Sequence, residues 1–567
     1  MIMMSATFNE EKQKKIIDEL HLKEAEELAQ VLAKKYQLPY IDLSKISINT
    51  DALRIVPEAE AREAKMAPFR FVGNNLQIAV LSPNNNKLKN ILEDLKGKNC
   101  KFTLYLVSTT SLERAFERYT EISASRKTEA GLIEISEDII SDFLDKFKNL
   151  VQIRDGIKVE AEEAGKQGGI SGILEIILSG ALAINASDIH FEPQDEEVRL
   201  RYRLDGVLQD VVPFSHRLYK QLLSRVKLMS GLKLNIKQSA QDGRFSIKAG
   251  DLEIEIRTSV IPGAYGESIV LRVLNPKSIA LSFEQLGVSD ELFRIFDREI
   301  HKPNGLILLT GPTGSGKTTT LYAFLKRVNS PENKIITIED PIEYHLKGIS
   351  QTQVSKEKGY TFLSGLRSAL RQDPDIIMVG EIRDTETAKI AINSALTGHL
   401  VFSTLHTNNS AGAIPRLIDL EINPKVMSSS LTLSIAQRLA RKLCPYCKQA
   451  DDPSSFERNL IEQVIVSIKK KKPEMELPKL EKVYRPTGCD KCNQTGYHGR
   501  QGLFEAVIMD EAVSEVAIKN PSEREIKVAS ISQGILDMRQ DGIVKVLEGI
   551  TSIEEIGRVV DLNEEII

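Results

Sequence analysis

The chain has 567 residues, of which 41% are hydrophobic and 27% charged, and its formal net charge is −4. This composition is typical of a globular protein with three or four domains, and it gives no electrostatic reason to expect nucleic-acid binding. No run of about 18 apolar residues predicts a membrane span. The first residues, MIMMSATFNEEKQKK, lack the pattern of a secretory signal, so we expect a cytoplasmic protein.

Residues 1–120 predict a small α/β or α+β domain. Helical spacing over 10–38 is followed by helix, strand, turn and strand over 52–85, with Gly73, Asn74 and Asn75 as the hairpin turn. Another helix and strand follow in ILEDLKGKNCKFTLYLVS. Residues 121–168 are charged and poor in aromatic residues, which predicts a linker with one helical stretch, EDIISDFLDKFKNL.

Residues 169–275 predict a second α/β domain. Its elements are a helix in SGILEIILSGALAINA, strands in DIHFEP and VRLRYRLDGVL, an amphipathic helix in HRLYKQLLSRVKLMSGL and an alternating hairpin in LEIEIRTSVIPGAYGESIVLRVL. We expect NIKQSAQDGRF to be a polar loop. Arg203, Arg244 in that loop and Arg257 on the hairpin are candidates for phosphate contact, because the guanidinium fork matches phosphate oxygens. A surface or salt-bridge role is an equally open alternative for each of them.

From 280 to 440 the pattern repeats strand, loop and helix, which predicts a parallel sheet with helices on both faces. Residues 306–318, LILLTGPTGSGKT, match the phosphate-binding pattern G-x-x-x-x-G-K-[ST] after a strand. Glycines let successive backbone N–H groups point at phosphate oxygens, Lys317 can reach the outer phosphates, and the Thr318 hydroxyl can bind Mg²⁺. We therefore expect ATP and Mg²⁺ here. The predicted contacts are Gly311, Pro312, Thr313, Gly314, Ser315, Gly316, Lys317, Thr318 and Thr319.

Three further strands of this domain end in polar residues, at Glu339, Glu381 and His406. In a parallel sheet, ligands gather at the carboxyl ends of the strands, so these groups should converge on the phosphates. Hydrolysis needs an activated water and a held metal ion; we expect Glu339 to activate water and Glu381 to hold the metal shell, since Gly380 replaces the usual Asp.

The role of His406 is open between contact with the γ-phosphate and a bond to backbone, and His399 is a weaker candidate. We expect no positive charge from this domain beyond Lys317. An arginine of the second domain, or of a neighbouring chain, would then supply the remaining charge.

Cys444, Cys447, Cys489 and Cys492 form two Cys-x-x-Cys pairs, whose spacing predicts a closed, structural zinc site within residues 441–505. Iron and a redox pair are the minor alternatives. Cys100 stands alone and is expected to be a small buried residue. Residues 506–567 predict a helical region.

Together these motifs resemble the secretion ATPases of bacterial type II secretion and type IV pilus assembly, over about 165–555. GPTGSGKTTTLYAFL is similar to the family's Walker A motif, TIEDPIEY (337–344) to its aspartate box, LRQDPDIIMVGEIRD (370–384) to its atypical Walker B motif and TGHLVFSTLHTN (397–408) to its histidine box. ASDIHFEP, RYRLDGVL and QDGR resemble its second N-terminal domain, and CPYC and CDKC its tetracysteine zinc module.

The resemblance implies a RecA-like ATPase core, a PAS-like second domain and a homo-hexamer with nucleotide between the 169–275 and 280–440 domains. It implies that Glu339 and Glu381 are catalytic and that Arg244 and Arg257 complete the pocket. The motor would drive a platform protein at the inner face of the cytoplasmic membrane. The presence of the first domain and the zinc module favours pilus assembly over retraction.

Three other functions remain to be weighed. A type II secretion motor of the same family is not separated from a pilus motor by these motifs. A nucleic-acid translocase on the same core conflicts with the acidic balance, and a regulator that binds nucleotide without hydrolysis conflicts with the intact acidic residues. Some relatives bind cyclic di-GMP in the first domain through paired leucine- and arginine-bearing motifs, which do not stand out cleanly in VPEAEAREAKMAPF and LQIAVLSPNN.

Overall fold

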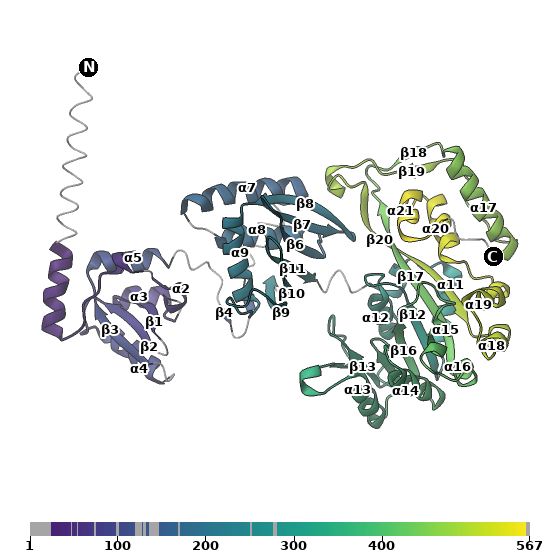
Figure 1. Ribbon diagram of the computed structural model, residues 1–567, viewed down its shortest axis with the longest axis horizontal. Coiled ribbons are helices and arrows are strands. Elements are labelled where there is room, and N and C mark those ends of the chain that lie inside the picture. Colours follow the sequence, from purple (N-terminus) through teal and green to yellow (C-terminus); the bar gives the residue numbers. More distant parts are fainter. Residues whose placement is uncertain are drawn as a thin grey trace, which may run out of the picture. The chain divides into compact units, whose positions relative to one another are not determined.

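The computed structural model describes residues 24–46, 48–53, 55–72, 75–97, 101–119, 127–128, 132–134, 147–167, 170–249, 252–275 and 281–562. The chain divides into two compact units, Met1–Ser136 with Glu163–Gly172, and Glu137–Glu162 with Ile173–Ile567. Each unit has hydrophobic core residues of its own. Figure 1 shows the helices and strands of the chain, coloured along the sequence.

The first unit is built on a three-stranded sheet. Strand β1 (Met66–Val72) runs antiparallel to β2 (Asn75–Val80), which pairs in parallel with β3 (Lys101–Leu106). The sheet packs against short helices, namely α2 (Thr50–Leu53), α3 (Glu58–Ala64), α4 (Asn86–Gly97) and α5 (Thr109–Glu117). A hairpin of β4 (Lys127–Thr128) and β5 (Leu132–Glu134) follows. Gly73, Asn74 and Cys100 lie outside the described residues.

In the second unit, residues 173–275 form a curved sheet in which six strands run in the order β9-β10-β11-β6-β7-β8. The strands are β6 (Asp188–Pro193), β7 (Val198–Leu204), β8 (Val207–Phe214), β9 (Gln241–Ala249), β10 (Leu252–Gly263) and β11 (Gly266–Leu274). Alternation along β7 buries every second residue, and the buried Tyr202 hydroxyl donates to the carbonyl oxygen of Ile177 in α8 (Ile170–Ala183). Helix α9 (His216–Met229) begins at the capping hydroxyl of Ser215.

Two features of this region differ from the sequence-based expectation. Helix α7 (Leu150–Gln167) lies within the predicted linker, and its Ile153 and Ile157 are fully buried. The QDGR segment is the start of strand β9, where Arg244 pairs directly with Arg257 of β10, so the prediction of a polar loop there was wrong. Polar residues dominate this strand, and its hydrogen bonds to β10 hold it in place.

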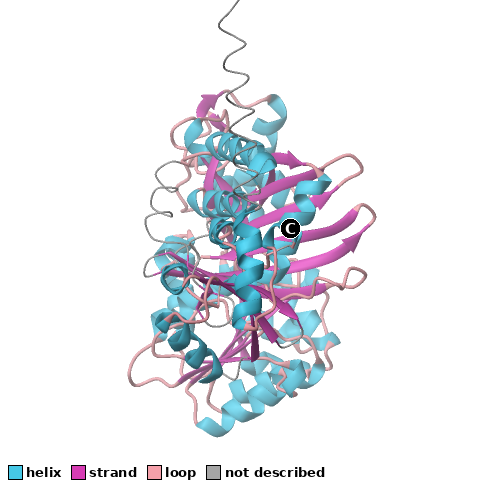
Figure 2. Ribbon diagram, turned by 90° about the vertical axis from the view of Figure 1, so that its left-hand side faces the viewer, coloured by secondary structure: helices cyan, strands magenta, loops and turns pink. Residues whose placement is uncertain are grey.

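Residues 305–508 contain a seven-stranded sheet in the order β14-β13-β15-β16-β12-β17-β20, with helices packed against it. Figure 2 distinguishes the helices from the strands by colour. All neighbouring pairs are parallel except β17 with β20. The strands are β12 (Gly305–Thr310), β13 (Ile335–Glu339), β14 (Ser350–Gln353), β15 (Ile376–Val379), β16 (Leu400–Leu405), β17 (Leu431–Leu443) and β20 (Tyr497–Ile508). The helices are α11 (Asp290–Ile300), α12 (Lys317–Val328), α13 (Phe362–Ala369), α14 (Thr385–Leu396), α15 (Ala413–Asp419) and α16 (Pro424–Ser430). Since β13, β15, β16 and β12 are neighbours that pair in parallel, their carboxyl ends lie at the same edge of the sheet.

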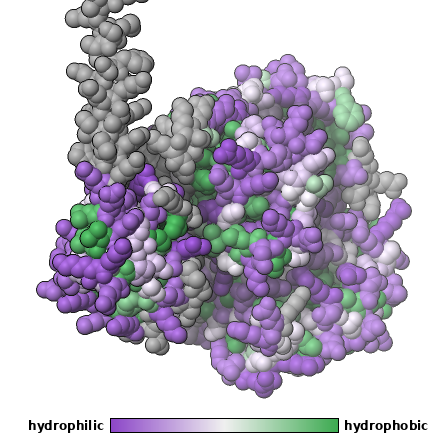
Figure 3. Space-filling model, turned by 60° about the vertical axis from the view of Figure 1, so that its left-hand side comes forward, coloured by the Kyte–Doolittle hydropathy of each residue, from purple (hydrophilic) through white to green (hydrophobic). Residues whose placement is uncertain are grey.

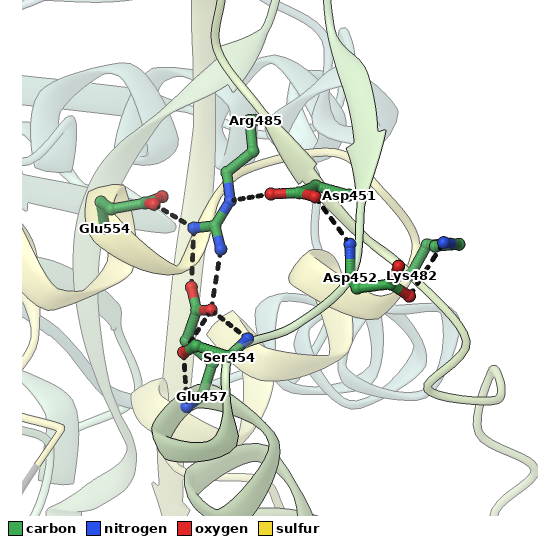
Figure 4. Close-up of polar contacts among 7 residues, drawn as sticks. All are labelled: Asp451, Asp452, Ser454, Glu457, Lys482, Arg485 and Glu554. Carbon is green, nitrogen blue, oxygen red and sulfur yellow. Dashed lines mark hydrogen bonds and ion pairs between the residues drawn. The ribbon is translucent and has the colours of Figure 1, made fainter.

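The last part of the chain joins this sheet through β17 and β20, which cross the predicted boundaries at 440 and 505. Its other elements are β18 (Gln449–Asp451), α17 (Ser455–Lys471), β19 (Val483–Arg485), α18 (Glu511–Ala517), α19 (Glu523–Ala529), α20 (Met538–Leu547) and α21 (Ile553–Val559). Arg485 of β19 forms a two-pronged ion pair with Glu457 at the start of α17, with both N–O distances 2.7 Å, and it also pairs with Glu554 of α21 (Figure 4). This arginine clamp fastens the segment between the cysteine pairs to the C-terminal helices.

Among the described residues, we find no helix with the length and hydropathy needed to cross a membrane. The face drawn in Figure 3 is mainly hydrophilic, with small and scattered hydrophobic areas.

Candidate active site and metal centre

The loop between β12 and α12 has the backbone geometry of a phosphate cradle. Gly311, Gly314 and Gly316 all have positive φ angles, and a Cβ atom at Gly311 would lie 2.5 Å from the carbonyl oxygen of Gln437. The buried Ser315 hydroxyl has no hydrogen-bond partner within the described residues. The positive φ angles favour glycine at these three positions. Together with the unsatisfied Ser315 hydroxyl and the N-terminus of α12, this backbone fits a polyphosphate.

Lys317, the first residue of α12, folds back over this loop. Its Nζ donates to the carbonyl oxygens of Gly311 at 2.8 Å and Pro312 at 3.0 Å. Burial lowers the pKa of Lys317, while the nearby Glu381 carboxylate opposes that shift. The lysine therefore lies between the phosphate loop and one of the predicted acids, as the sequence pattern requires.

Glu381 follows β15 and stands at the edge with a mostly buried side chain, 13% exposed. It forms an ion pair with Arg383 and lies 3.3 Å from Nε2 of His406. Burial raises the pKa of Glu381, but hydrogen bonds and charge from Arg383 and His406 outweigh burial and lower it overall. Glu381 is thus held as a carboxylate beside the phosphate loop, which suits a group that binds a metal ion or its water.

Gly380 precedes this acid and leaves little room for a side chain. Its added Cβ would lie 3.2 Å from the carbonyl oxygen of Ile338 on the neighbouring strand. The Asp that is usual at this position would need that neighbour to shift.

Glu339, at the end of β13, is buried much more deeply, with 2% exposed. Its Oε2 accepts the Tyr322 hydroxyl, and its Oε1 accepts Thr337 Oγ1 at 2.5 Å and Gln351 Nε2 at 3.1 Å. Burial, and then the charge of Glu339, raise the pKa of Tyr322, so its hydroxyl remains a donor. Both carboxylate oxygens are therefore occupied by the protein itself.

Glu343, four residues further along, is an acid that sequence reasoning did not single out. Its Oε2 accepts a hydrogen bond of 3.2 Å from Arg257 of β10, whose guanidinium also donates to the carbonyl oxygen of Ile342 at 2.9 Å. The aspartate-box segment therefore carries three acids, of which Glu339 is buried, Asp340 is exposed and Glu343 is held by the second domain. The signal available was the second Glu of TIEDPIEY, but its partner lies 86 residues away.

The four predicted cysteines come together as one cluster, with all four Sγ atoms within 4.8 Å of one another. Three Sγ–Sγ distances are 3.7–3.8 Å, far longer than a disulfide and close to the roughly 3.8 Å edge of a tetrahedron with 2.3 Å zinc–sulfur bonds. The backbone N–H groups of Cys489 and Gly496 donate to the Sγ of Cys492, which stabilises a thiolate. The cluster fits a four-coordinate metal ion.

Comparison with known proteins identifies the family. The family model described as type II/IV secretion system protein matches residues 163–558, and the model of the MshEN domain matches residues 36–126. The chain belongs to the type II/IV secretion family. The resemblance inferred from the motifs is thereby confirmed, and with it the assignment to secretion-system ATPases.

Individual relatives carry both names within this family. The type IV pilus assembly ATPase PilB of Myxococcus xanthus is 36% identical over 534 residues, which are 94% of this chain and 91% of that protein. The type II secretion system ATPase E of Vibrio cholerae is 38% identical and covers 89% of this chain and 98% of its own length. A solved structure of the pilus retraction motor PilT with bound ADP is 27% identical, with a TM-score of 0.46, over 68% of this chain and 94% of that one.

The arginines of this secretion ATPase occupy different environments. Arg203 pairs with Asp188 at 3.1 Å, and Arg272 reaches the other oxygen of the same carboxylate at 3.1 Å. Arg244 is 71% exposed and lies 3.6 Å from Glu255, which Arg257 also contacts. These arginines stand in one row across neighbouring strands, and Arg257 is the one that reaches the core within a single chain.

The expectation that the core adds no positive charge beyond Lys317 was wrong. Arg383 binds Glu381 directly, and the charge of Arg438 on β17 is close enough to lower the pKa of Lys317, after the larger effect of burial. Arg438 lines a cavity of about 490 Å³ together with Asn408, the last residue of the histidine box, and Ser410 just after it. Sequence reasoning missed Arg438 because β17 reaches this edge through pairing with β12, more than 100 residues away.

The histidine-box loop is fastened to distant parts of the chain. Buried Glu505 of β20 accepts hydrogen bonds from the backbone N–H and hydroxyl of Ser410 and from the N–H of Met538 at the start of α20. Asn409 donates to Glu523 of α19 at 2.6 Å. His406 itself is 54% exposed and remains at the edge beside Glu381, whereas His399 bonds to a backbone carbonyl.

Proposed function

We propose that this protein is a hexameric motor that hydrolyses ATP to drive type IV pilus assembly. The observation that carries the proposal is the similarity to the pilus assembly ATPase PilB over 94% of the chain, first domain included. The edge geometry supports hydrolysis, since a phosphate loop, a charged lysine and two acids from neighbouring strands converge there.

In the proposed reaction, the N–H groups of the phosphate loop and Lys317 hold the β- and γ-phosphates, and the Thr318 hydroxyl and Glu381 hold the metal shell. The ion held there would be Mg²⁺, and it would supply neutralisation of the developing negative charge. Glu339 activates the attacking water once its carboxylate is turned toward the nucleotide, and Glu343 is a second candidate for that role because it is less buried. His406 and Arg383 fix Glu381, and Arg244 and Arg257 add positive charge within the hexamer.

The remaining assignments are also proposals. They are a RecA-like fold for the core and a PAS-like fold for residues 170–275, structural zinc in the cysteine cluster, and a cytoplasmic position at the membrane through a platform protein. We expect no nucleic-acid partner. The resemblance raises cyclic di-GMP as a ligand of residues 36–126, although the paired leucine- and arginine-bearing motifs do not stand out there, and calorimetry with the purified chain tests it.

A type II secretion motor is the second candidate, because the relatives of that name are equally similar. Deletion of the gene, with complementation by wild type and by Lys317→Ala, separates the two. Loss of surface pili in electron micrographs, restored by wild type alone, supports the pilus motor. Intact pili with exoproteins trapped inside the cell support the secretion motor instead.

A further inference from the structure

Glu339 is an unusual acid for an active site, because the protein itself fully occupies its oxygens. Three donors reach it from three elements: Tyr322 from α12, Thr337 from β13 and Gln351 from β14. Tyr322 is fully buried and lies one helical turn beyond Lys317 and Thr318 on the same helix. The hydroxyl that holds Glu339 is therefore rigidly connected to the residues that hold phosphate.

The network continues from Tyr322 toward the second domain. The Tyr322 hydroxyl oxygen accepts weaker hydrogen bonds, each 3.4 Å, from the backbone N–H of Glu343 and from Gln351 Nε2. The Glu343 carboxylate is in turn bound by Arg257, which also holds the carbonyl oxygen of Ile342. Arg257, Glu343, Tyr322 and Glu339 thus form one continuous chain of contacts.

We infer that Tyr322 is the positioning residue for Glu339, and that Arg257 acts on this carboxylate through Glu343 and Tyr322. The inference rests on the proposed function, because it assumes that Glu339 takes part in hydrolysis. A shift of the second domain that moves Arg257 pulls on Glu343, whose N–H contacts the same hydroxyl that holds Glu339. The angle of Glu339 toward a nucleotide is thereby coupled to the position of the second domain.

The groups around Glu339 define what a pH measurement would report. The phenol of Tyr344 packs edge-on against the Tyr322 ring, with centroids 4.7 Å apart, and Lys326 lies over the Tyr344 ring. Burial, and then the charge of Glu339, raise the pKa of Tyr344 to about 12. Both phenols therefore stay neutral near neutral pH. The charged neighbours include the adjoining Asp340 and the ion pair of Glu343 with Arg257, which also contacts Glu255.

The first test is Tyr322→Phe in the full-length protein, which removes one hydroxyl and keeps the ring. A carboxylate that loses a donor takes up a proton more readily, so the acid limb of the kcat–pH profile should move to higher pH by about one unit. We expect kcat at neutral pH to fall about tenfold, with KM for ATP changed less than about twofold. Tyr360→Phe is the matched control, because its hydroxyl bonds to Thr352 on the neighbouring strand and not to Glu339.

A purely structural role would lower the melting temperature and leave the acid limb where it is, and that result overturns the inference. If the variant is too unstable, Gln351→Leu removes another donor of the same carboxylate and is judged by the same pH profile. Failure of the proposed function looks different, because Glu339→Gln would then keep full turnover whatever Tyr322→Phe does.

The link to the second domain is tested by a double-mutant cycle of Tyr322→Phe with Glu343→Gln. If Glu343 acts through Tyr322, the double variant should lose little more kcat than the worse single variant. If the fold-losses in kcat of the two single variants multiply in the double variant, Glu343 acts independently of Tyr322. Arg257 would then not act on Glu339 through Glu343 and Tyr322.

Discussion

The cysteine cluster takes its four ligands from two short turns, whereas the nucleotide edge gathers residues from four strand ends and from a second domain. Spacing brings the two cysteines of each pair together, because a tight turn closes the pair, and the pairing of β17 with β20 brings the two pairs to each other. At the nucleotide edge, equally conspicuous residues acquire different environments from partners far along the chain. Glu339 is 2% exposed and bound by three donors, while Glu381 is 13% exposed and held by Arg383 and His406. The spacing of the cysteines is therefore enough to predict the cluster, whereas the environments of Glu339 and Glu381 depend on contacts with residues far along the chain.

If this contrast is right, substitutions at the nucleotide edge should abolish ATP hydrolysis and leave the stability of the fold unchanged. The largest effect is expected for Lys317→Ala, because the main charge at the phosphates is lost. Phosphate release should fall more than about 100-fold, with nucleotide binding weakened and the melting temperature almost unchanged. Arg327→Ala is the control on the same helix, since its partner Asp297 is remote from the edge. Turnover that survives in Lys317→Ala contradicts the assignment of the phosphate loop.

The next largest effects are expected for Glu339 and Glu381, whose variants should differ in their response to Mg²⁺. Glu339→Gln and Glu381→Gln should each lower kcat by about 10²–10⁴-fold, and fluorescent nucleotide binding should persist. For Glu381→Gln only, we expect weaker Mg²⁺ binding, so that half-maximal turnover needs a higher Mg²⁺ concentration. Because the pKa of Glu381 is lowered, its charge is present above the usual range near 4.5 and is lost only as pH falls below it. If Glu343→Gln is inactive while Glu339→Gln turns over, the water-activating role belongs to Glu343.

At the cysteine cluster we expect the opposite, namely that a substitution lowers the stability of the fold more than it lowers the rate of ATP hydrolysis. Cys489→Ser should lower bound zinc, measured by mass spectrometry, from about one per chain to near zero and should reduce the melting temperature. Cys100→Ser is the control and should keep its metal. A wild-type protein that purifies without zinc or iron would remove the structural metal site.

The smallest effect is expected at the arginine clamp beside the cluster. Hydrogen bonds from Arg485 lower the pKa of Glu457 to about 2 despite partial burial. A lowered folded-state pKa stabilises the protein above the unfolded value near 4.5, and that contribution is lost as pH falls toward 2. Glu457→Gln should therefore melt about 2–4 °C below wild type at pH 7, and the gap should close in acid. Lys482→Ala, which removes an exposed ion pair with Asp452, should show no such gap.

Much of the core could be predicted because its signals are local. The buried run LILLT, the glycine loop and the Cys-x-x-Cys pairs each specify their structure within a few residues. Strand β17, LTLSIAQRLARKL, could not be predicted in this way, because it becomes a strand by pairing with β12 and β20. Tyr322 has the appearance of an ordinary core residue of a helix, and only the structure shows its hydroxyl on Glu339.

Strand β17 also has a mechanical consequence. Its hydrogen bonds to β12 begin at Leu431 and extend to Ala436, opposite Thr310 at the phosphate loop, and its pairing with β20 continues to Leu443, next to Cys444. At about 3.3 Å per residue, the 13 residues of this strand span roughly 43 Å. Up to Ala436 the strand is paired on both sides, and from there to Leu443 β20 alone supports it, so one continuous strand connects the phosphate loop with the residue before Cys444. A displacement of the phosphate loop would therefore reach the cysteine cluster along a single strand.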